Sequence, residues 1–368
     1  MKETLPTFLF IFVAAFVAYA SFYVIGPFNN IDSFIYVAQV EQFENGELTA
    51  EPLDVAWRAF KPLYGVVGAL LGPALDPWEA MQIFNLILLF GLPFVSFGFL
   101  KELGFSREES VWGSVWIVTG YPVLKYGLAV STDLGGWFFA VATAYLVLLG
   151  LKRNSIRTLF FASLVGFIGG TAKEPGVFGL VFGGLYILFT SGTRTLKKTL
   201  QYIAALALPA FVLEVLLFAI LIYAGLPTFL DWYGLVVADD FVEEHFRLFR
   251  FIGVFGSTFS VLLPLAFFGL IHVIRRRTGT SSAFAKTGAL ILASLPILFW
   301  TVFISRILYI QFLAFVPLAL WGVVELSHYV PETKQRAAKS MLYILPILTA
   351  VILFLIAGDR SLFEVLFV

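Results

Sequence analysis

A small set of ionisable side chains stands in stretches of the chain that are otherwise apolar. Two are acids and three are bases, and a tyrosine accompanies the last base: Asp32 in FNNIDSFIY, Lys61 in AFKPLYG, Asp133 in VSTDLGGWFF, Lys173 in GGTAKEPGVFG, and Arg306 with Tyr309 in SRILYIQF. A charge near lipid costs roughly 2.5–3.5 kcal/mol at a helix centre, so such residues need a function or a partner. If the fold brings these side chains to the same depth in a membrane, the two carboxylates and three cations would form a pocket. Such a pocket could hold a phosphate and activate a hydroxyl.

The backbone around Lys173 fits such a pocket. Gly169, Gly170, Pro175 and Gly176 flank the lysine, and residues of these types interrupt a helix. Interrupted backbone is tolerated in a membrane only beside protein or a water-filled cavity. An unwound turn at a helix start also offers amide donors to an anion.

Two of these residues, and Arg58 beside one of them, also have purely structural interpretations. Asp133 precedes Leu-Gly-Gly at a helix start, where an Asp is often only the N-cap. Lys61 and its neighbour Arg58 could extend along apolar surface to reach lipid headgroups.

Other charged residues leave similar alternatives open. Lys173 and Glu174 could form a structural ion pair with each other or with Arg306. The acidic segment 226–248 could be a solvated connector. Glu214, in the middle of an apolar run, is given no role, and the three histidines are too far apart in the chain to suggest a metal cluster.

The elements that must position these residues follow from the composition. The chain has 368 residues, of which 60% are hydrophobic and 13% charged, and its mean hydropathy is +0.92. A soluble domain of this size could not cover so much apolar surface, whereas a bilayer can. The formal net charge of zero indicates no nucleic-acid partner, and the lack of cysteine rules out disulfides and thiolate ligands.

Apolar runs predict an all-α, polytopic bundle of transmembrane helices with about eleven spans, each near 20 residues. The predicted spans are 5–26, 78–100, 108–129, 134–151, 156–172, 175–191, 199–225, 249–274, 284–304, 307–328 and 340–358. The first is interpreted as a retained span rather than a signal peptide, because no small-residue cleavage site is clear. The run 62–75 is short and contains Pro and Gly, so we expect an interfacial helix there.

Lysine and arginine positions predict the orientation. With the N-terminus in the cytoplasm, the cytoplasmic connections hold roughly twice as many basic residues as the outer ones, in clusters at 101–107, 152–157, 194–198, 275–286 and 334–339. Counting 62–75 as a span would place these clusters outside. We therefore expect one membrane-embedded domain over 1–368, without a separate soluble domain. Its long outer loops would be 27–77 and 226–248, so the chemistry would lie at the outer face of the cell membrane.

These segments, in this order, resemble the GT-C superfamily of membrane glycosyltransferases, particularly the protein O-mannosyltransferase and aminoarabinose-transferase branch. The resemblance covers about residues 5–328. It is carried by an acid after the first span with a following Tyr-x-x-Ala-like helix that ends at Gly (DSFIYVAQVEQFENG), a Lys-Pro pair that opens an interfacial helix (FKPLYG), an acid after the third span (YGLAVSTD), a Gly-flanked lysine (GGTAKEPG), and a basic residue with Tyr opening a late span (SRILYIQF). Ser33 stands where the mannosyltransferase branch usually has a second acid, which disfavours protein mannosylation.

The resemblance implies roles for individual residues. Asp32 would be the general base on an acceptor hydroxyl or a ligand of a divalent cation (Mg, Mn or Zn). Asp133 would orient the acceptor or share that metal. The lipid phosphate would be held by five residues: Lys61, Lys173, Arg306, Tyr309 and Arg58.

The expected reaction transfers a sugar from a polyprenyl-phosphate donor of dolichyl type to a hydroxyl of a protein, lipid or glycan acceptor, with inversion. The interfacial helices around 31–45 and 62–75 would seat the lipid head. Two alternatives from other classes stay open, a secondary transporter and a lipid-carrier flippase, since intramembrane charges and broken helices fit them too. Transporters usually place such charges near the midplane and often show internal repeats, and no repeat is visible here.

Overall fold

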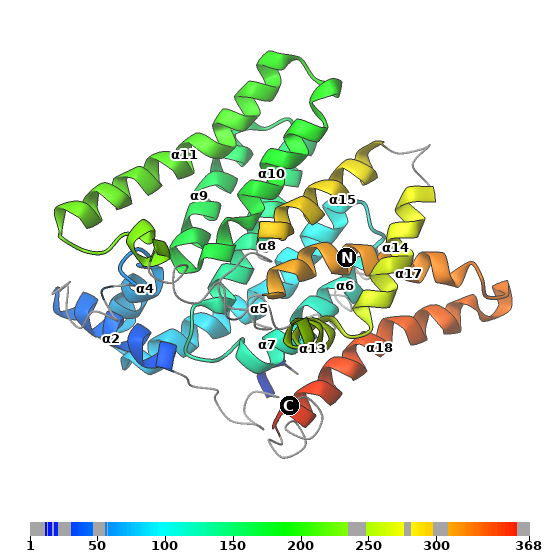
Figure 1. The fold of residues 1–368 in the computed structure, drawn as a ribbon, viewed down its shortest axis with the longest axis horizontal. Coiled ribbons are helices and arrows are strands. Elements are labelled where there is room, and N and C mark those ends of the chain that lie inside the picture. Colours follow the sequence, from blue (N-terminus) through cyan, green and yellow to red (C-terminus); the bar gives the residue numbers. More distant parts are fainter. Residues whose placement is uncertain are drawn as a thin grey trace.

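Every element in the described part of this computed structural model is a helix (Figure 1), so the predicted all-α class is confirmed there. The description covers residues 12, 14–16, 18–20, 31–46, 56, 58–234, 248–275, 281–296 and 308–358. The α-helices are α2 (Ile31–Asn45), α4 (Leu63–Leu71), α5 (Pro77–Leu103), α6 (Arg107–Thr119), α7 (Tyr121–Tyr126), α8 (Asp133–Lys152), α9 (Ile156–Ala172), α10 (Phe178–Phe189), α11 (Leu196–Tyr223), α13 (Leu248–Phe259), α14 (Leu262–Arg275), α15 (Ser281–Ser294), α17 (Phe312–Ser327) and α18 (Glu332–Gly358). Short 3₁₀ turns are η1 (Glu174–Val177), η2 (Ser191–Thr193) and η4 (Tyr309–Gln311).

Five helices of the described chain are long and apolar enough to cross a membrane: Pro77–Leu103, Asp133–Lys152, Leu196–Tyr223, Tyr309–Ser327 and Glu332–Ile356. Four shorter apolar helices accompany them: Ile156–Ala172, Glu174–Phe189, Leu262–Arg275 and Phe284–Ser294. The chain is therefore a multi-pass helical protein by length and composition. The predicted total of about eleven spans stays a prediction, and the first predicted span lies mostly outside the described residues.

Two predicted spans are broken in the structure. The run 108–129 stops as a helix at Gly120, whose ψ of 142 leaves the helical region, and a short α7 begins one residue before Pro122. The run 249–274 divides into α13 and α14 at Ser260, which has a positive φ of 44. Apolar content alone predicted single helices here, but a backbone in either conformation cannot continue an α-helix.

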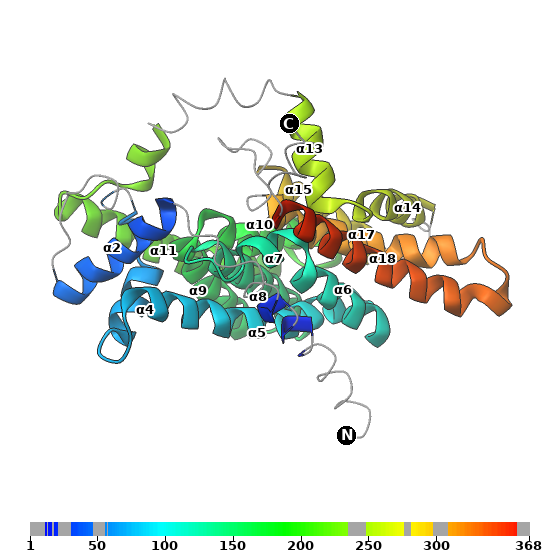
Figure 2. The same ribbon diagram turned by 90° about the horizontal axis from the view of Figure 1, so that it is seen from below.

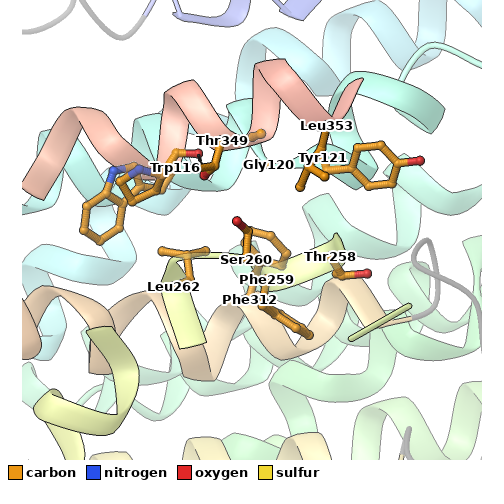
Figure 3. Close-up of a pocket in the computed structure, with 12 residues that line it drawn as sticks. Trp116, Gly120, Tyr121, Thr258, Phe259, Ser260, Leu262, Phe312, Thr349 and Leu353 are labelled. Atoms are coloured by element: carbon orange, nitrogen blue, oxygen red, sulfur yellow. Dashed lines mark hydrogen bonds between the residues drawn. The ribbon is translucent and has the colours of Figure 1, made fainter. Parts of the chain in front are cut away.

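These two breaks face each other (Figure 3). Gly120 and Tyr121 from one break, and Thr258 and Ser260 from the other, line a small cavity between α6, α7, α13, α17 and α18. Its volume of about 10 Å³ is on the order of a single water molecule. The contact is therefore packed, and it leaves no space for a substrate.

The helices differ in how much of their apolar surface they cover. Helix α8 lies centrally against α5, α9 and α10 (Figure 1), and both α8 and α17 are mostly buried. Helices α11 and α18 are peripheral and bury few of their side chains, and the exposed apolar residues of α11 include Leu208, Phe211 and Ile220. Such a large apolar surface on outer helices is typical of contact with lipid.

The predicted interfacial run is the nine-residue helix α4, which is too short to span a bilayer. It packs against α2, and both lie at one edge of the bundle beside the ends of α9 and α11 (Figures 1 and 2). Ala59 and Phe60, just before α4, pack against Leu221 and Leu226 from the end of α11. The first long loop is thereby packed against the C-terminal end of α11 and the residues that follow it, and its position at a membrane interface stays a prediction.

Candidate active site

Three ion pairs lie at the Asp133 end of α8. Arg58 Nη2 is 2.9 Å from Asp32 Oδ1, Lys173 Nζ is 3.5 Å from Asp133 Oδ1, and Lys61 pairs with Glu174. All six side chains are largely buried, and Lys61 and Asp133 are almost completely so. Each pair joins segments that are far apart in sequence.

The buried phenol of Tyr36 connects the three pairs. Tyr36 lies one turn after Asp32 on α2, its hydroxyl accepts a hydrogen bond from Thr132 Oγ1 at 3.1 Å, and the guanidinium carbon of Arg58 lies 5.6 Å from its ring centroid. Burial raises the pKa of Tyr36, but the positive charges of Lys173, Arg58 and Lys61 outweigh burial and hold the pKa below its usual value. One residue thus feels the cations of all three pairs, so the pairs form a single cluster.

Lys61 is held by α2 and by aromatic rings. Gln39 of α2 donates hydrogen bonds to the carbonyl oxygens of Arg58 at 2.9 Å and of Lys61 at 3.5 Å. The Lys61 ammonium lies 4.8 Å from the ring centroid of Phe60 and 4.9 Å from that of Trp232, close enough for cation–π attraction. Burial lowers the pKa of Lys61, and the Glu174 carboxylate works against that shift.

Asp133 is positioned by a buried network around Asn85 of α5. Asn85 Nδ2 donates to the carbonyl oxygens of Ala129 at 2.9 Å and Ser131 at 3.0 Å, the last residues before α8. Asn85 Oδ1 accepts a hydrogen bond from the Tyr64 hydroxyl at 2.5 Å. The same hydroxyl accepts from the Gly135 amide at 3.1 Å and so satisfies an N–H of the first turn of α8. The turn that carries Asp133 is therefore fixed by α4 and α5.

Two glycines allow this close assembly. A Cβ on Gly135 would lie 2.8 Å from the Tyr64 hydroxyl, and a Cβ on Gly136 would lie 2.7 Å from Lys173 Cβ. On the opposite side, a Cβ on Gly176 would overlap the carbonyl of Gly169. The glycines on both sides of this contact are needed for the η1 turn to pack on α8 and α9.

Five of the predicted site residues meet in this cluster: Asp32, Arg58, Lys61, Asp133 and Lys173. Tyr309 is buried elsewhere in the core: its hydroxyl donates to the Ile117 carbonyl at 2.7 Å, and its ring lies 4.2 Å from that of Trp137, one turn after Asp133. Arg306 lies outside the described residues. The catalytic and binding roles stay predictions.

The purely structural interpretations of Asp133, Lys61 and Glu174 do not agree with the observed contacts. Thr132, not Asp133, is the N-cap of α8. Lys61 is too buried to reach lipid headgroups. Glu174 pairs with Lys61 rather than with Lys173, because η1 aims its first side chain toward the loop before α4.

Sequence reasoning missed the partners of the predicted residues. Asn85 was visible as a polar residue inside the apolar run 78–100, and Tyr36 as part of the Tyr-x-x-Ala segment. Nothing in the sequence links Glu174 to Lys61 or Trp232 to the same lysine. Those contacts depend on how α11 and η1 pack against the first loop.

The predicted divalent cation finds no ready ligand set. In the part of the chain that the structure describes, no group of three or more His, Cys, Asp or Glu side chains is placed to share an ion. Asp32 and Asp133 face Arg58 and Lys173 instead. The divalent cation therefore stays a prediction.

A larger cavity of about 200 Å³ opens at the start of α5. Its lining combines apolar residues with two polar ones: Tyr19, Leu75, Ile83, Leu86 and Leu128 with Glu79 and Gln82. None of the six paired side chains lines it. It therefore lies beside the charged cluster rather than within it.

Comparison with known proteins identifies the fold. No family model and no curated protein sequence matches this chain. Among solved structures, the apo crystal structure of the Archaeoglobus fulgidus oligosaccharyltransferase is similar, with a TM-score of 0.67 and 12% identity over 98% of this chain. The alignment covers 56% of that protein, so this chain spans little more than half of its length. The chain thus shares the fold of the matched part of that oligosaccharyltransferase.

Proposed function

We propose that the protein is a membrane glycosyltransferase that moves a sugar from a polyprenyl-phosphate donor, of dolichyl type, to an acceptor hydroxyl. The observation that carries this proposal is the cluster of three cations and three carboxylates at one end of α8, in a chain that shares the fold of part of an oligosaccharyltransferase. A glycosyl transfer of this kind needs a base for the acceptor and cations for the leaving phosphate, and the cluster holds both.

In the proposed reaction, Asp32 takes the proton of the acceptor hydroxyl. The acceptor oxygen forms a bond with the anomeric carbon while the bond from that carbon to the phosphate oxygen breaks, so the configuration inverts. The lipid phosphate leaves with an additional negative charge. Lys61 and Lys173 stabilise this growing charge, and Arg58 orients the Asp32 carboxylate through the 2.9 Å contact.

Asp133 has a different part in this proposal. Its carboxylate faces Lys173 at 3.5 Å and its turn is held by the Asn85 network. A rigid carboxylate beside a phosphate-binding lysine can orient a second acceptor hydroxyl and fix the lysine. Asp133 is therefore proposed to position reactants rather than to take the proton.

The contacts at the other end of α8 support the proposed orientation. Lys152 pairs with Glu102 at 2.9 Å, Lys286 donates to the carbonyl of Glu102 at 2.8 Å, and Lys198 donates to Asn154 at 3.0 Å. Four of the predicted cytoplasmic connections thus meet there. The 20 residues of α8 rise about 30 Å, the thickness of a hydrocarbon core. The ion-pair cluster would then lie at the outer face.

The test is sugar transfer by the purified protein in detergent, with a polyprenyl-phosphate sugar as donor and product detection by mass spectrometry. Asp32→Asn should lower the rate at least about 100-fold, the lower range for loss of a general base. Glu102→Gln, at the opposite end of α8, is the matched control and should keep the wild-type rate.

Wild-type transfer by Asp32→Asn would remove Asp32 from the chemistry. Uptake of a soluble solute into proteoliposomes by a protein that transfers no sugar would instead favour the transporter alternative.

A further inference from the structure

Among the described residues, the charged cluster pairs three cations with three carboxylates. A donor phosphate would bring a further negative charge to lysines that already have partners. For the phosphate to bind one of these lysines, the carboxylate that pairs with that lysine must move away. A buried cation gains little from a second anion that cannot come into contact with it. The question is which pair opens.

The Lys61–Glu174 pair is the best placed to open. The rings of Phe60 and Trp232 lie over the Lys61 ammonium. The Glu174 carboxylate occupies another direction from which an anion could reach that ammonium. An anion that binds Lys61 must come to the place where that carboxylate is. Lys61 is among the most deeply buried side chains of the described chain, so its charge is screened little by water.

The backbone at Glu174 lets its side chain leave. Glu174 begins the η1 turn after Lys173, whose extended φ of −157 and ψ of 144 end α9. Apart from Lys61 and the backbone N–H of Glu174 itself, no described residue donates a hydrogen bond to the Glu174 carboxylate. By contrast, Asp133 sits in a turn that is fixed by Asn85 and Tyr64. Releasing Glu174 would therefore leave the turn that carries Asp133 in place.

We propose that Glu174 is an internal substitute for the donor phosphate, and that lipid-phosphate binding exchanges this carboxylate for a phosphate oxygen on Lys61. This inference rests on the proposed function and assigns to the site a residue that limits donor affinity. The exchange breaks and forms no covalent bond. The exchange adds the negative charge of the phosphate to the cluster. That charge also raises the proton affinity of the Asp32 carboxylate, so the carboxylate becomes a better base.

Two consequences separate exchange from a purely structural ion pair. If Glu174 competes with phosphate, removing its charge must tighten phosphate binding. If Glu174 only supports the fold, removing its charge must leave phosphate binding unchanged or weaken it. The gain must also depend on Lys61, since the exchange takes place on that lysine.

The experiment measures the dissociation constant of a short-chain polyprenyl monophosphate for the full-length protein in detergent by isothermal titration. Glu174→Gln should bind at least about tenfold more tightly than wild type, equivalent to 1.4 kcal/mol. Inorganic phosphate, a probe without a lipid chain, should show the same order at weaker affinity. The gain should disappear in Glu174→Gln combined with Lys61→Met. Glu102→Gln is the matched control and should bind as wild type does.

A second variant covers poor folding of Glu174→Gln. Glu174→Asp keeps the charge and draws the carboxylate back by one methylene, so it should bind more tightly than wild type by a smaller factor. Unchanged or weaker binding by whichever variant folds, with wild-type binding that depends on Lys61, would overturn the exchange and leave the proposed function standing. No binding of the lipid phosphate to wild type and to every variant would overturn the proposed function itself.

Discussion

The two ends of α8 hold their charges in different ways. At the Asp133 end, Lys173 and Asp133 are both inside the protein, with 14% and 3% of their side chains exposed. At the Lys152 end, the Lys152 side chain is 67% exposed where it pairs with Glu102, whose own side chain is 14% exposed. The contact distances are similar, at 3.5 Å and 2.9 Å, and only the surroundings differ.

The difference in exposure changes what the ion pairs at each end of α8 contribute. An exposed ion pair contributes about 0–1 kcal/mol to stability and is screened by salt. A buried pair repays its desolvation poorly, and replacement by apolar residues is often neutral or stabilising. Charges that are kept inside at such cost, together with three glycines that admit them, fit the chemistry proposed for the Asp133 end. The Lys152 end is explained by solvation and orientation alone.

The largest expected effect comes from removing a cation at each end. Lys173→Met should lower sugar transfer by about 100-fold or more, because the leaving phosphate loses a preorganised positive charge. Lys152→Met should change the rate less than about twofold, since an exposed surface pair contributes little. Equal rates for the two variants, measured with the same donor in detergent, would erase the distinction between the ends.

A smaller effect is expected from adding one methyl group. Gly136→Ala should destabilise the protein by about 1–3 kcal/mol, the usual cost of overpacking, since its Cβ would lie 2.7 Å from Lys173 Cβ. Gly184→Ala in α10 is the control, because no atom lies within 4 Å of its added Cβ. Thermal unfolding in detergent measures both, and a wild-type midpoint for Gly136→Ala would show that the contact with η1 is loose.

The smallest effect concerns the exposed pair. Glu102→Gln should lower stability by at most about 1 kcal/mol at low ionic strength, and the difference from wild type should vanish near 1 M salt, where the screening length is about 3 Å. Unfolding midpoints at two salt concentrations test this. A loss that persists at high salt would mean that the Lys152 end is less exposed than its side chains indicate.

Much of the candidate site could be predicted from the sequence, for a physical reason. In a chain where 13% of residues are charged, an ionic side chain in an apolar stretch is expensive, so Asp32, Lys61, Asp133 and Lys173 stand out. The all-helical class follows equally from the apolar runs. These inferences need only composition and position along the chain.

The remainder depended on tertiary packing. The helix breaks at Gly120 and Ser260 were not predicted, because hydropathy carries no information about backbone angles. The pairing of Lys61 with Glu174, and its cover by Trp232, require α4, η1 and the end of α11 to meet. Nothing in any one of those segments specifies the others.

The Lys61–Glu174 pair also has a consequence for how the protein is made. A ribosome delivers Lys61 first, and Glu174 follows only after all the helices from α4 to α9 have been synthesised. Until Glu174 has been made, Lys61 lacks this counterion, so lipid headgroups or water must solvate its charge. A nascent chain that stalls before Glu174 therefore leaves the Lys61 ammonium without the carboxylate that pairs with it in the folded protein.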